Sequence, residues 1–159
     1  SISKDLETYK AVFGIENIVY SHTATFIYKD NGKDRNLISS IFLTAENITV
    51  INTRYDLKYR IPLGDIVDFT TENKMLKYYV HLEYGRQSKR YNASIDFTTK
   101  GDGNTFITLL SLAVEVDRKR LDLENTYENE MTKIQEYKDK ELKNINEEKR
   151  KIINNIQYV

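Results

Sequence analysis

From Asn104 to Val159 the chain contains neither glycine nor proline. These two residues most often end a helix, so nothing local stops a helix in this stretch. A continuous helix here would be roughly 80 Å long at about 1.5 Å per residue, several times the width of a small domain. We therefore predict a helix whose first part packs on a folded domain and whose remainder leaves the core.

The residues before Gly101 have the composition of β-strands. Asn31-Gly32 lies between two runs of β-branched and aromatic residues and predicts a tight hairpin. The predicted strands cover 17–29, 35–44, 47–53, 56–62, 66–72, 76–84 and 89–98. A short helix should precede them, capped by Ser3 and ended by Gly14. Hydrophobic residues make up 40% of the 159, enough for one core.

The long helix should begin just after the two glycines Gly101 and Gly103, which we interpret as a turn from strand to helix. Asn104 or Thr105 can cap it. An apolar stripe follows at helical spacing, with Val114 to one side of it: Phe106, Leu109, Leu110, Ala113 and Val116. Such a stripe can cover one end of a barrel. The fold class is therefore α+β, mostly β, with seven antiparallel strands curled into a small barrel or sandwich.

Two segments carry a resemblance to a known family: "LTAENITVIN" (43–52) and "YRIPLGDIVDF" (59–69). With seven strands and a helix, the chain resembles the bacterial pleckstrin-homology-like domains, which are related to GRAM domains. The resemblance covers about residues 15–120. It implies a bent sheet or barrel, capped by a C-terminal helix that here continues as a long charged extension, and a binding or targeting role. The expected organisation is a short helix (1–14), a pleckstrin-homology-like domain (15–120) and a helical extension (121–159).

The same resemblance implies a candidate phosphate site in the first hairpin. Members that bind inositol phosphates carry cations where this chain has Lys29, Lys33 and Arg35. Asp30 and Asp34 are interleaved with them and cancel much of the charge, so a solvated hairpin tip is the competing interpretation. Further basic residues that could join the site are, in one hairpin, Arg86, Lys89 and Arg90, and in another, Arg54, Lys58 and Arg60.

The extension carries apolar residues at regular intervals. Leu123, Ile134, Ile145 and Ile156 recur every eleven residues, beside a parallel series of Met131, Leu142 and Ile153, with Ile152 adjacent. Eleven residues make three turns at about 3.67 per turn, so the stripe stays on one side of the helix. We expect it to meet another helix, from its own copy, from a partner or from a fold-back near 125–129 or 144–146. The alternative is a solvated helix held by ion pairs such as Glu136–Lys140 and Glu147–Lys151.

The composition limits the remaining function classes. Acidic and basic residues balance at 24 each, so nucleic acid or anionic membrane binding would need a local patch. With no cysteine there is no thiolate metal site, and His22 and His81 are isolated, one expected near the core and one on the surface. We expect no catalytic residue, no metal and no cofactor. The 12 tyrosines are explained by strand packing, with stacking on single-stranded nucleic acid as a minor alternative.

These observations predict a non-catalytic binding or assembly module that works through helix pairing with a protein partner or its own copy. The alternative is a peripheral module that binds a lipid headgroup through the basic hairpins. No run of about 18 apolar residues spans a bilayer and no signal peptide is apparent, so we expect a cytoplasmic location, peripheral to the membrane under the alternative. The abundance of Asn, Ile, Lys and Tyr is typical of a bacterial source.

Overall fold

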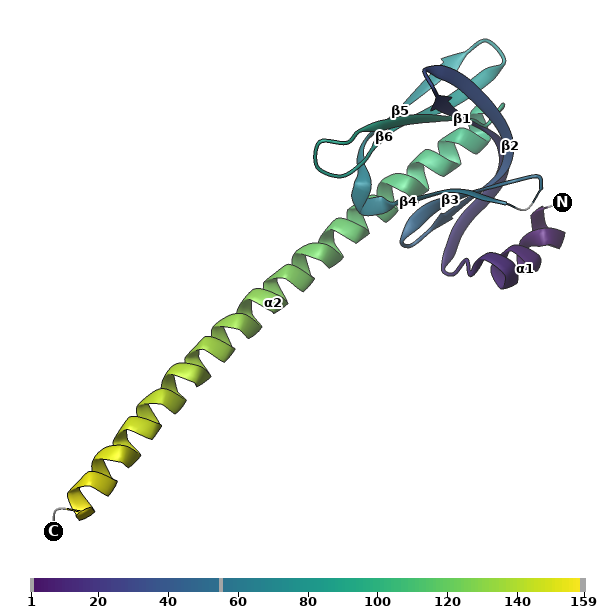
Figure 1. The fold of residues 1–159 in the computed structure, drawn as a ribbon. Coiled ribbons are helices and arrows are strands. Elements are labelled where there is room, and N and C mark those ends of the chain that lie inside the picture. Colours follow the sequence, from purple (N-terminus) through teal and green to yellow (C-terminus); the bar gives the residue numbers. More distant parts are fainter. Residues whose placement is uncertain (1, 55, 158–159) are drawn as a thin grey trace. The chain divides into compact units, whose positions relative to one another are not determined.

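The computed structural model of the protein describes residues 2–54 and 56–157, with side chains throughout except at 2–6, 9, 57 and 58. Within these ranges seven strands form one antiparallel sheet in the order β4-β3-β2-β1-β7-β6-β5 (Figure 1). The elements are α1 (Ile2–Phe13), β1 (Ile18–Asp30), β2 (Lys33–Thr44), β3 (Asn47–Asn52), β4 (Leu57–Pro62), η1 (Leu63–Asp65), β5 (Ile66–Lys74), β6 (Lys77–Tyr84), β7 (Tyr91–Asp96) and α2 (Lys100–Gln157). The predicted fold class is confirmed.

Strand β1 holds the two halves of the sheet together. It pairs with β2 from Ile18 to Asp30, and its residues Thr25–Tyr28 also pair with β7. Strands β4 and β5 are the two edges, and the sheet stays unclosed between them. The single turn η1 connects these edges, and Gly85 donates a backbone hydrogen bond to the Asp65 carbonyl at 2.9 Å. The curved sheet thus encloses an interior that is open along one seam.

The first turns of α2 fill this interior. Phe106 and Leu110 are fully buried and Val114 is 3% exposed, all within the cluster formed by the inner face of the sheet. The prediction that this stripe covers the barrel is therefore confirmed for Phe106 and Leu110. The placement of Val116 was wrong, because it is 66% exposed while Val114 faces the core. The helix has apolar residues on two sides, and helical spacing alone did not tell which side packs inward.

Helix α2 starts earlier than predicted. Its first residue is Lys100, and the backbone N–H of Asp102 donates to Thr99 Oγ1 at 3.3 Å while Thr99 Oγ1 donates to Asp102 Oδ2 at 2.7 Å. Thr99 is therefore the cap, in place of Asn104 or Thr105. Gly101 and Gly103 lie inside the first turn, so their interpretation as a strand-to-helix turn was wrong. A side chain at Gly103 would overlap the ring of Tyr78, which explains the glycine.

A second, smaller apolar cluster lies on the outer face of the sheet. Ile15, Phe42 and Ile51 are its buried members, and Phe13 packs against them. Helix α1 ends here, where Gly14 adopts a left-handed φ of 63° and its N–H donates to the Lys10 carbonyl at 3.0 Å. The helix begins at Ile2, so Ser3 does not precede it as a cap. Leu6, Tyr9, Val12 and Phe13 recur at helical spacing in this segment, but the side chains of Leu6 and Tyr9 lie outside those that the structure describes.

The chain divides into two compact units, Ser1–Arg118 and Lys119–Val159. In the second unit, α2 is helical without a break as far as Gln157. The alternative in which the helix folds back near 125–129 or 144–146 is therefore wrong. Ion pairs on its surface include Arg120–Glu124 (2.8 Å), Lys133–Glu130 (3.2 Å) and Lys151–Glu148 (3.5 Å). Lys151 thus pairs with Glu148 rather than with Glu147, and all of these groups are exposed.

Candidate functional site

The cations of the β1–β2 hairpin have carboxylate partners. Lys29 Nζ lies 2.8 Å from Asp34 Oδ1, and Arg35 Nε lies 3.5 Å from Asp30 Oδ2. Lys33 stands directly across from Asp30 in the strand register. Because successive residues of a strand point to opposite faces, Lys29 lies on the other face of the hairpin from Lys33 and Arg35. A phosphate on the Lys33 and Arg35 face would therefore meet two cations and would have to displace the Arg35–Asp30 ion pair.

The β6–β7 hairpin uses both of its arginines to hold the chain in place. Arg86 Nε donates to Asp65 Oδ1 at 2.8 Å, across to the connection between β4 and β5. Arg90 Nη1 donates to the carbonyls of Gln87 at 2.6 Å and Lys89 at 3.1 Å. Lys89 is exposed. The phosphate-binding role of these three residues stays a prediction, and the contacts describe a loop stabilised by its own arginines.

The third basic group is not gathered at one point. Arg60 Nη2 donates to the Phe13 carbonyl at 3.2 Å, which ties β4 to the end of α1. Arg54 is exposed, and its backbone N–H donates to Asn52 Oδ1 at 3.2 Å. The side chain of Lys58 lies outside the described residues. We therefore assign no anion site to this group.

Partly buried tyrosines pack against the core near the β1–β2 hairpin. The ring of Tyr59 lies 4.8 Å from Phe26 and 5.3 Å from Tyr28. Burial, and then the neighbouring Tyr28 and Asp30, raise the pKa of Tyr59. Burial, and then Tyr59 and Tyr91, likewise raise the pKa of Tyr84. The phenols are therefore neutral at physiological pH, and they close this end of the core rather than present a charged group.

His81 belongs to a hydrogen-bonded row that the sequence did not predict. Its Nδ1 lies 2.6 Å from Ser94 Oγ, and its Nε2 lies 2.9 Å from Glu72 Oε1, so three strands contribute one group each. The row borders a groove of about 430 Å³ on the outer face of β5, β6 and β7. Residue types match those of hydrolytic triads, but Ser94 sits in a strand paired on both sides. Backbone N–H groups around it are engaged in the ladder, which leaves no pair of donors for an oxyanion.

The other histidine also lies partly exposed rather than in the core. His22 Nε2 is 3.2 Å from Asp102 Oδ2, and Nδ1 donates to the Thr23 carbonyl at 2.6 Å. These contacts tie β1 to the first turn of α2. In the described part of the chain, no group of three or more metal-ligating side chains occurs. Nor is any described helix long and apolar enough to cross a membrane.

An apolar hollow lies beside the outward side of α2 in the first unit. It has a volume of about 260 Å³ and is lined by Val19, Ala45, Leu109, Leu112, Ala113 and Val116. Leu112 is 55% exposed and Val116 is 66% exposed. Leu112 and Val116 do not belong to the core cluster, whereas Leu109 and Ala113 pack against it. The hollow is a surface on which an apolar side chain could pack, without polar groups to select a small molecule.

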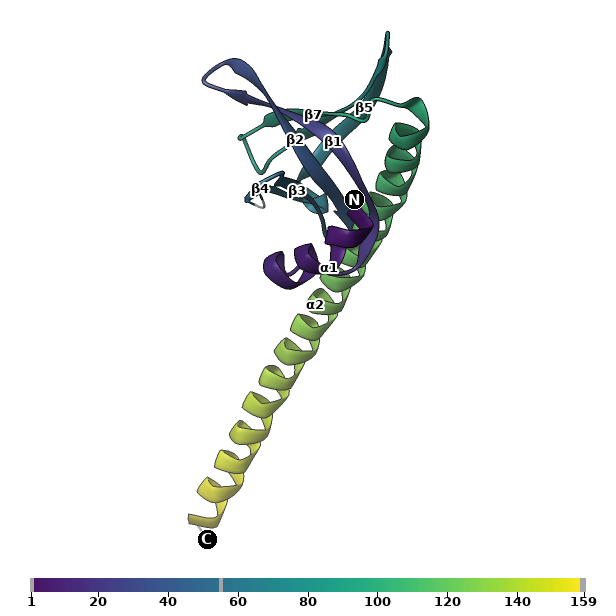
Figure 2. The ribbon, with the colours of Figure 1, turned by 90° about the vertical axis from the view of Figure 1, so that its right-hand side faces the viewer.

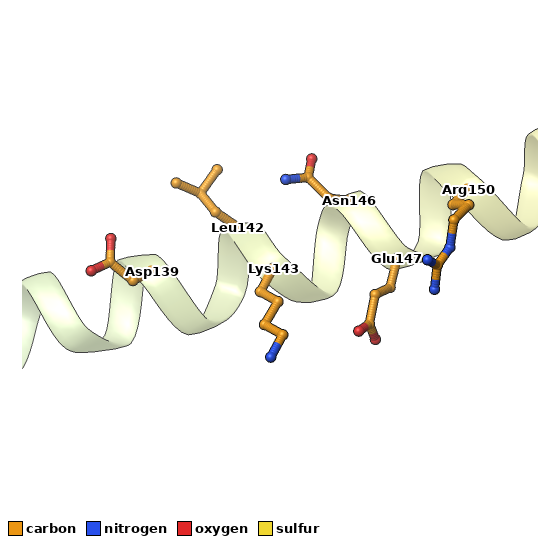
Figure 3. Close-up of a pocket in the computed structure, with 6 residues that line it drawn as sticks. All are labelled: Asp139, Leu142, Lys143, Asn146, Glu147 and Arg150. Carbon is orange, nitrogen blue, oxygen red and sulfur yellow. The ribbon is translucent and has the colours of Figure 1, made fainter.

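The extension presents its predicted stripe to water. Its members, with exposed fractions, are Leu123 71%, Met131 46%, Ile134 48%, Leu142 56%, Ile145 47%, Ile152 58%, Ile153 54% and Ile156 69%. Tyr127, four residues after Leu123, is 67% exposed. A hollow of about 470 Å³ lies among Asp139, Leu142, Lys143, Asn146, Glu147 and Arg150. Figure 3 shows all six projecting from one helix, so this hollow is a strip of helix surface rather than an enclosed pocket.

No protein-family model and no curated protein matches the sequence. Solved structures are similar in fold. They include a Vav1 exchange factor containing PH and C1 domains (15% identity, TM-score 0.47, 71% of this chain and 34% of that chain) and the C-terminal domain of an unknown Leishmania infantum protein (11%, 0.48, 72% and 99%). This chain spans about a third of the Vav1 chain. The Vps36 N-terminal PH domain matches with 17% identity and a TM-score of 0.50 over 64% of this chain and 81% of that chain. The chain therefore has the fold of a pleckstrin-homology domain.

Proposed function

We propose that the protein is a non-catalytic binding and assembly module in which a pleckstrin-homology-like domain (15–120) carries a helix-pairing extension (121–159). The observation that supports this most is the exposed stripe of the extension. Its isoleucines and leucines are about half exposed or more in a single helix. Solvated helices usually place polar residues on such a face, so a regular apolar line indicates that a second helix covers it.

The spacing of the stripe indicates which repeat a partner helix should have. Leu123, Ile134, Ile145 and Ile156 form one series at intervals of eleven, and Met131, Leu142 and Ile153 form another. A third series, Tyr127, Lys138 and Lys149, runs between them and places two cations in the seam. A repeat of eleven gives a nearly straight or gently right-handed pairing. A helix with the same repeat, such as a second copy of this chain, fits this line best.

The two lysines favour an antiparallel arrangement of the copies. A parallel pairing in register would place Lys138 against Lys138 and Lys149 against Lys149, which is unfavourable in an apolar seam. An antiparallel pairing can place Leu123 at the level of Ile156 and Ile134 at the level of Ile145. In that register Lys138 lies level with Glu141 of the other copy, and Lys149 lies level with Glu130. Opposite charges then replace like charges at both levels.

Cysteine cross-linking tests the proposal, since the chain has no cysteine of its own. Ile134→Cys protein mixed with Ile145→Cys protein should form mixed disulfides on mild oxidation. Ile134→Cys alone should not, because its two copies would stand about 16 Å apart along the axis, eleven residues at about 1.5 Å each. Disulfides only between identical variants would contradict the antiparallel register. Sedimentation of the full chain as a monomer at every concentration would contradict the pairing itself.

The alternative is headgroup binding through Lys29, Lys33, Arg35, Arg86, Lys89 and Arg90. We give it less weight, because Lys29, Arg35 and Arg86 already pair with carboxylates. It remains testable with the double reversal Lys33→Glu and Arg35→Glu. If headgroups bind here, that variant should lose binding to vesicles containing phosphatidylinositol phosphates while its stability changes by about 0–1 kcal/mol, as expected for exposed charges. Unchanged binding would remove this alternative.

A further inference from the structure

Two of the hairpins with two-residue turns have a left-handed residue at the tip, and these two tips differ in chemistry. The β1–β2 tip is Asn31-Gly32, with left-handed φ values of 51° and 77°. The β5–β6 tip is Met75-Leu76, where Met75 has a φ of 56°. Asparagine and glycine are the residues that such turns favour, whereas methionine pays a steric cost in the left-handed region. The second tip therefore holds a residue that the turn itself does not favour.

The folded domain gains no packing energy from these two apolar residues. Met75 is 94% exposed and Leu76 is 87% exposed, so neither side chain packs on the rest of the domain. The predicted strand 76–84 begins with Leu76, but β6 begins one residue later, at Lys77, so Leu76 belongs to the turn. Two large apolar side chains thus stand together in water at the end of a hairpin. Figure 2 shows this hairpin projecting from the sheet, well apart from the β1–β2 turn.

The residues beside the tip are both cationic. Lys74 and Lys77 are paired directly across the two strands, and both are exposed. Like charges opposite one another destabilise a hairpin. In the described part of the chain neither ammonium has a carboxylate partner within ion-pair distance, since the nearby Glu72 contacts His81 at 2.9 Å. The tip therefore combines exposed apolar residues with two uncompensated positive charges, the reverse of the β1–β2 tip, where aspartates neutralise the cations.

We propose that the β5–β6 tip is a membrane-insertion site for an anionic lipid surface. Met75 and Leu76 enter the boundary between headgroups and acyl chains, while Lys74 and Lys77 contact the anionic headgroups. A specific protein interface buries about 800 Å² on each partner and needs a shaped surface, which two side chains on a narrow turn do not provide. A bilayer accepts apolar side chains without shape complementarity. Charge and size therefore both favour lipid over a protein partner.

The first test is a vesicle-sedimentation assay with the full chain and its extension unchanged. The double variant Met75→Asn with Leu76→Ser gives the second tip the polar character of the first. It should bind vesicles of phosphatidylcholine and phosphatidylserine at least about tenfold more weakly than the wild type. Its stability to denaturant should be equal or higher, because asparagine suits the left-handed φ. Loss of binding without loss of stability supports insertion; wild-type binding by this variant overturns it.

Charge is tested by Lys74→Gln with Lys77→Gln. Removing two lysines next to an anionic surface should weaken binding about thirtyfold, and added salt should weaken wild-type binding in the same direction. Equal binding of the wild type to pure phosphatidylcholine would contradict the role of the lysines. Failure of the wild type to bind phosphatidylserine vesicles at low salt would overturn the whole proposal.

A fluorescence measurement locates the tip, since the chain has no tryptophan. Met75→Trp and Asn31→Trp place the single reporter at matching left-handed positions of the two hairpins. Emission of the Met75→Trp variant should shift to the blue when anionic vesicles are added, while that of the Asn31→Trp variant should stay unchanged. An unchanged emission from Met75→Trp, or an equal shift from both, contradicts insertion through this tip.

Discussion

The double substitution Ile134→Asp with Ile145→Asp is the sharpest perturbation of the extension. In the proposed antiparallel register these two residues lie level with each other across the seam. Each dimer would then contain four aspartates at two neighbouring levels. Carboxylates in an apolar seam lose hydration without gaining partners. We therefore expect dissociation of the pair without any change in the domain.

The magnitude follows from the exposed fractions. Full burial of an isoleucine is worth roughly 1.5–3 kcal/mol. Ile134 is 48% exposed and Ile145 is 47% exposed, so about half of that gain, about 1 kcal/mol each, remains available to a partner. Four such side chains per dimer give about 4 kcal/mol, which corresponds to a dissociation constant about a thousandfold higher. The cost of removing the new aspartate carboxylates from water weakens the dimer further.

Sedimentation velocity over a range of concentrations measures the effect. A matched control is Asn129→Asp with Asn154→Asp, which adds the same charge on the opposite side of the helix at about 100° per residue. This control should dimerise like the wild type. Circular dichroism should show lower helicity for the Ile134→Asp/Ile145→Asp variant, because an unpaired helix frays. Dimers of that variant with wild-type affinity, or equal loss in the control, would refute the reasoning.

Three further predictions concern the domain. Gly103→Ala should lower the free energy of unfolding by about 1–3 kcal/mol because its methyl group meets the Tyr78 ring, whereas Gly101→Ala, with open space around it, should raise it by about 0.5–1 kcal/mol; chemical denaturation compares the two. Because burial raises the pKa of Tyr84 above its ordinary value of 10.0, stability should be complete below pH 10 and fall as pH rises through the higher folded value, and Tyr84→Phe should make that fall shallower in alkaline denaturation. Truncation after Arg118 should leave a folded monomer, because all described buried residues lie at or before Asp117; loss of cooperative thermal unfolding would contradict this.

Local patterns were enough to predict the strands. Asn31-Gly32 predicted the β1–β2 turn, and alternation of apolar residues placed all seven strands of the described chain within a few residues of their observed bounds. The start of α2 was missed because Gly101 and Gly103 have low helix propensity. Tertiary packing overrides that propensity, since the Tyr78 ring occupies the space next to Gly103 and Tyr78 Oη donates to Asn104 Oδ1 at 2.6 Å. Such a contact depends on a strand far away in the sequence.

The candidate sites were harder to predict, because charge compensation depends on strand register. The interleaved Asp30 and Asp34 hinted at it, but only the pairing of β1 with β2 puts Lys29 on Asp34. The same holds for Glu72, His81 and Ser94, which come together from three strands. His81 lies opposite Ser94 because Tyr84 pairs with Tyr91 across the 85–90 loop, whereas the predicted strand ends at 84 and 89 would have placed it opposite Asn92. Once the register is known, the face on which a side chain lies follows from the alternation along the strand. Its neighbours on the adjacent strands follow from the same register.

Two groups of apolar residues that folding leaves in water, the stripe and the β5–β6 tip, need different partners. The stripe of the extension is periodic, so it requires a partner with the same repeat over its length. The tip at Met75-Leu76 has no repeat and consists of two apolar side chains between lysines. It therefore fits a negatively charged partner that needs no shape complementarity, such as an anionic lipid surface. One ligand does not meet both requirements. Pairing and membrane contact should therefore be lost independently, with stripe variants keeping vesicle binding and tip variants keeping their oligomeric state.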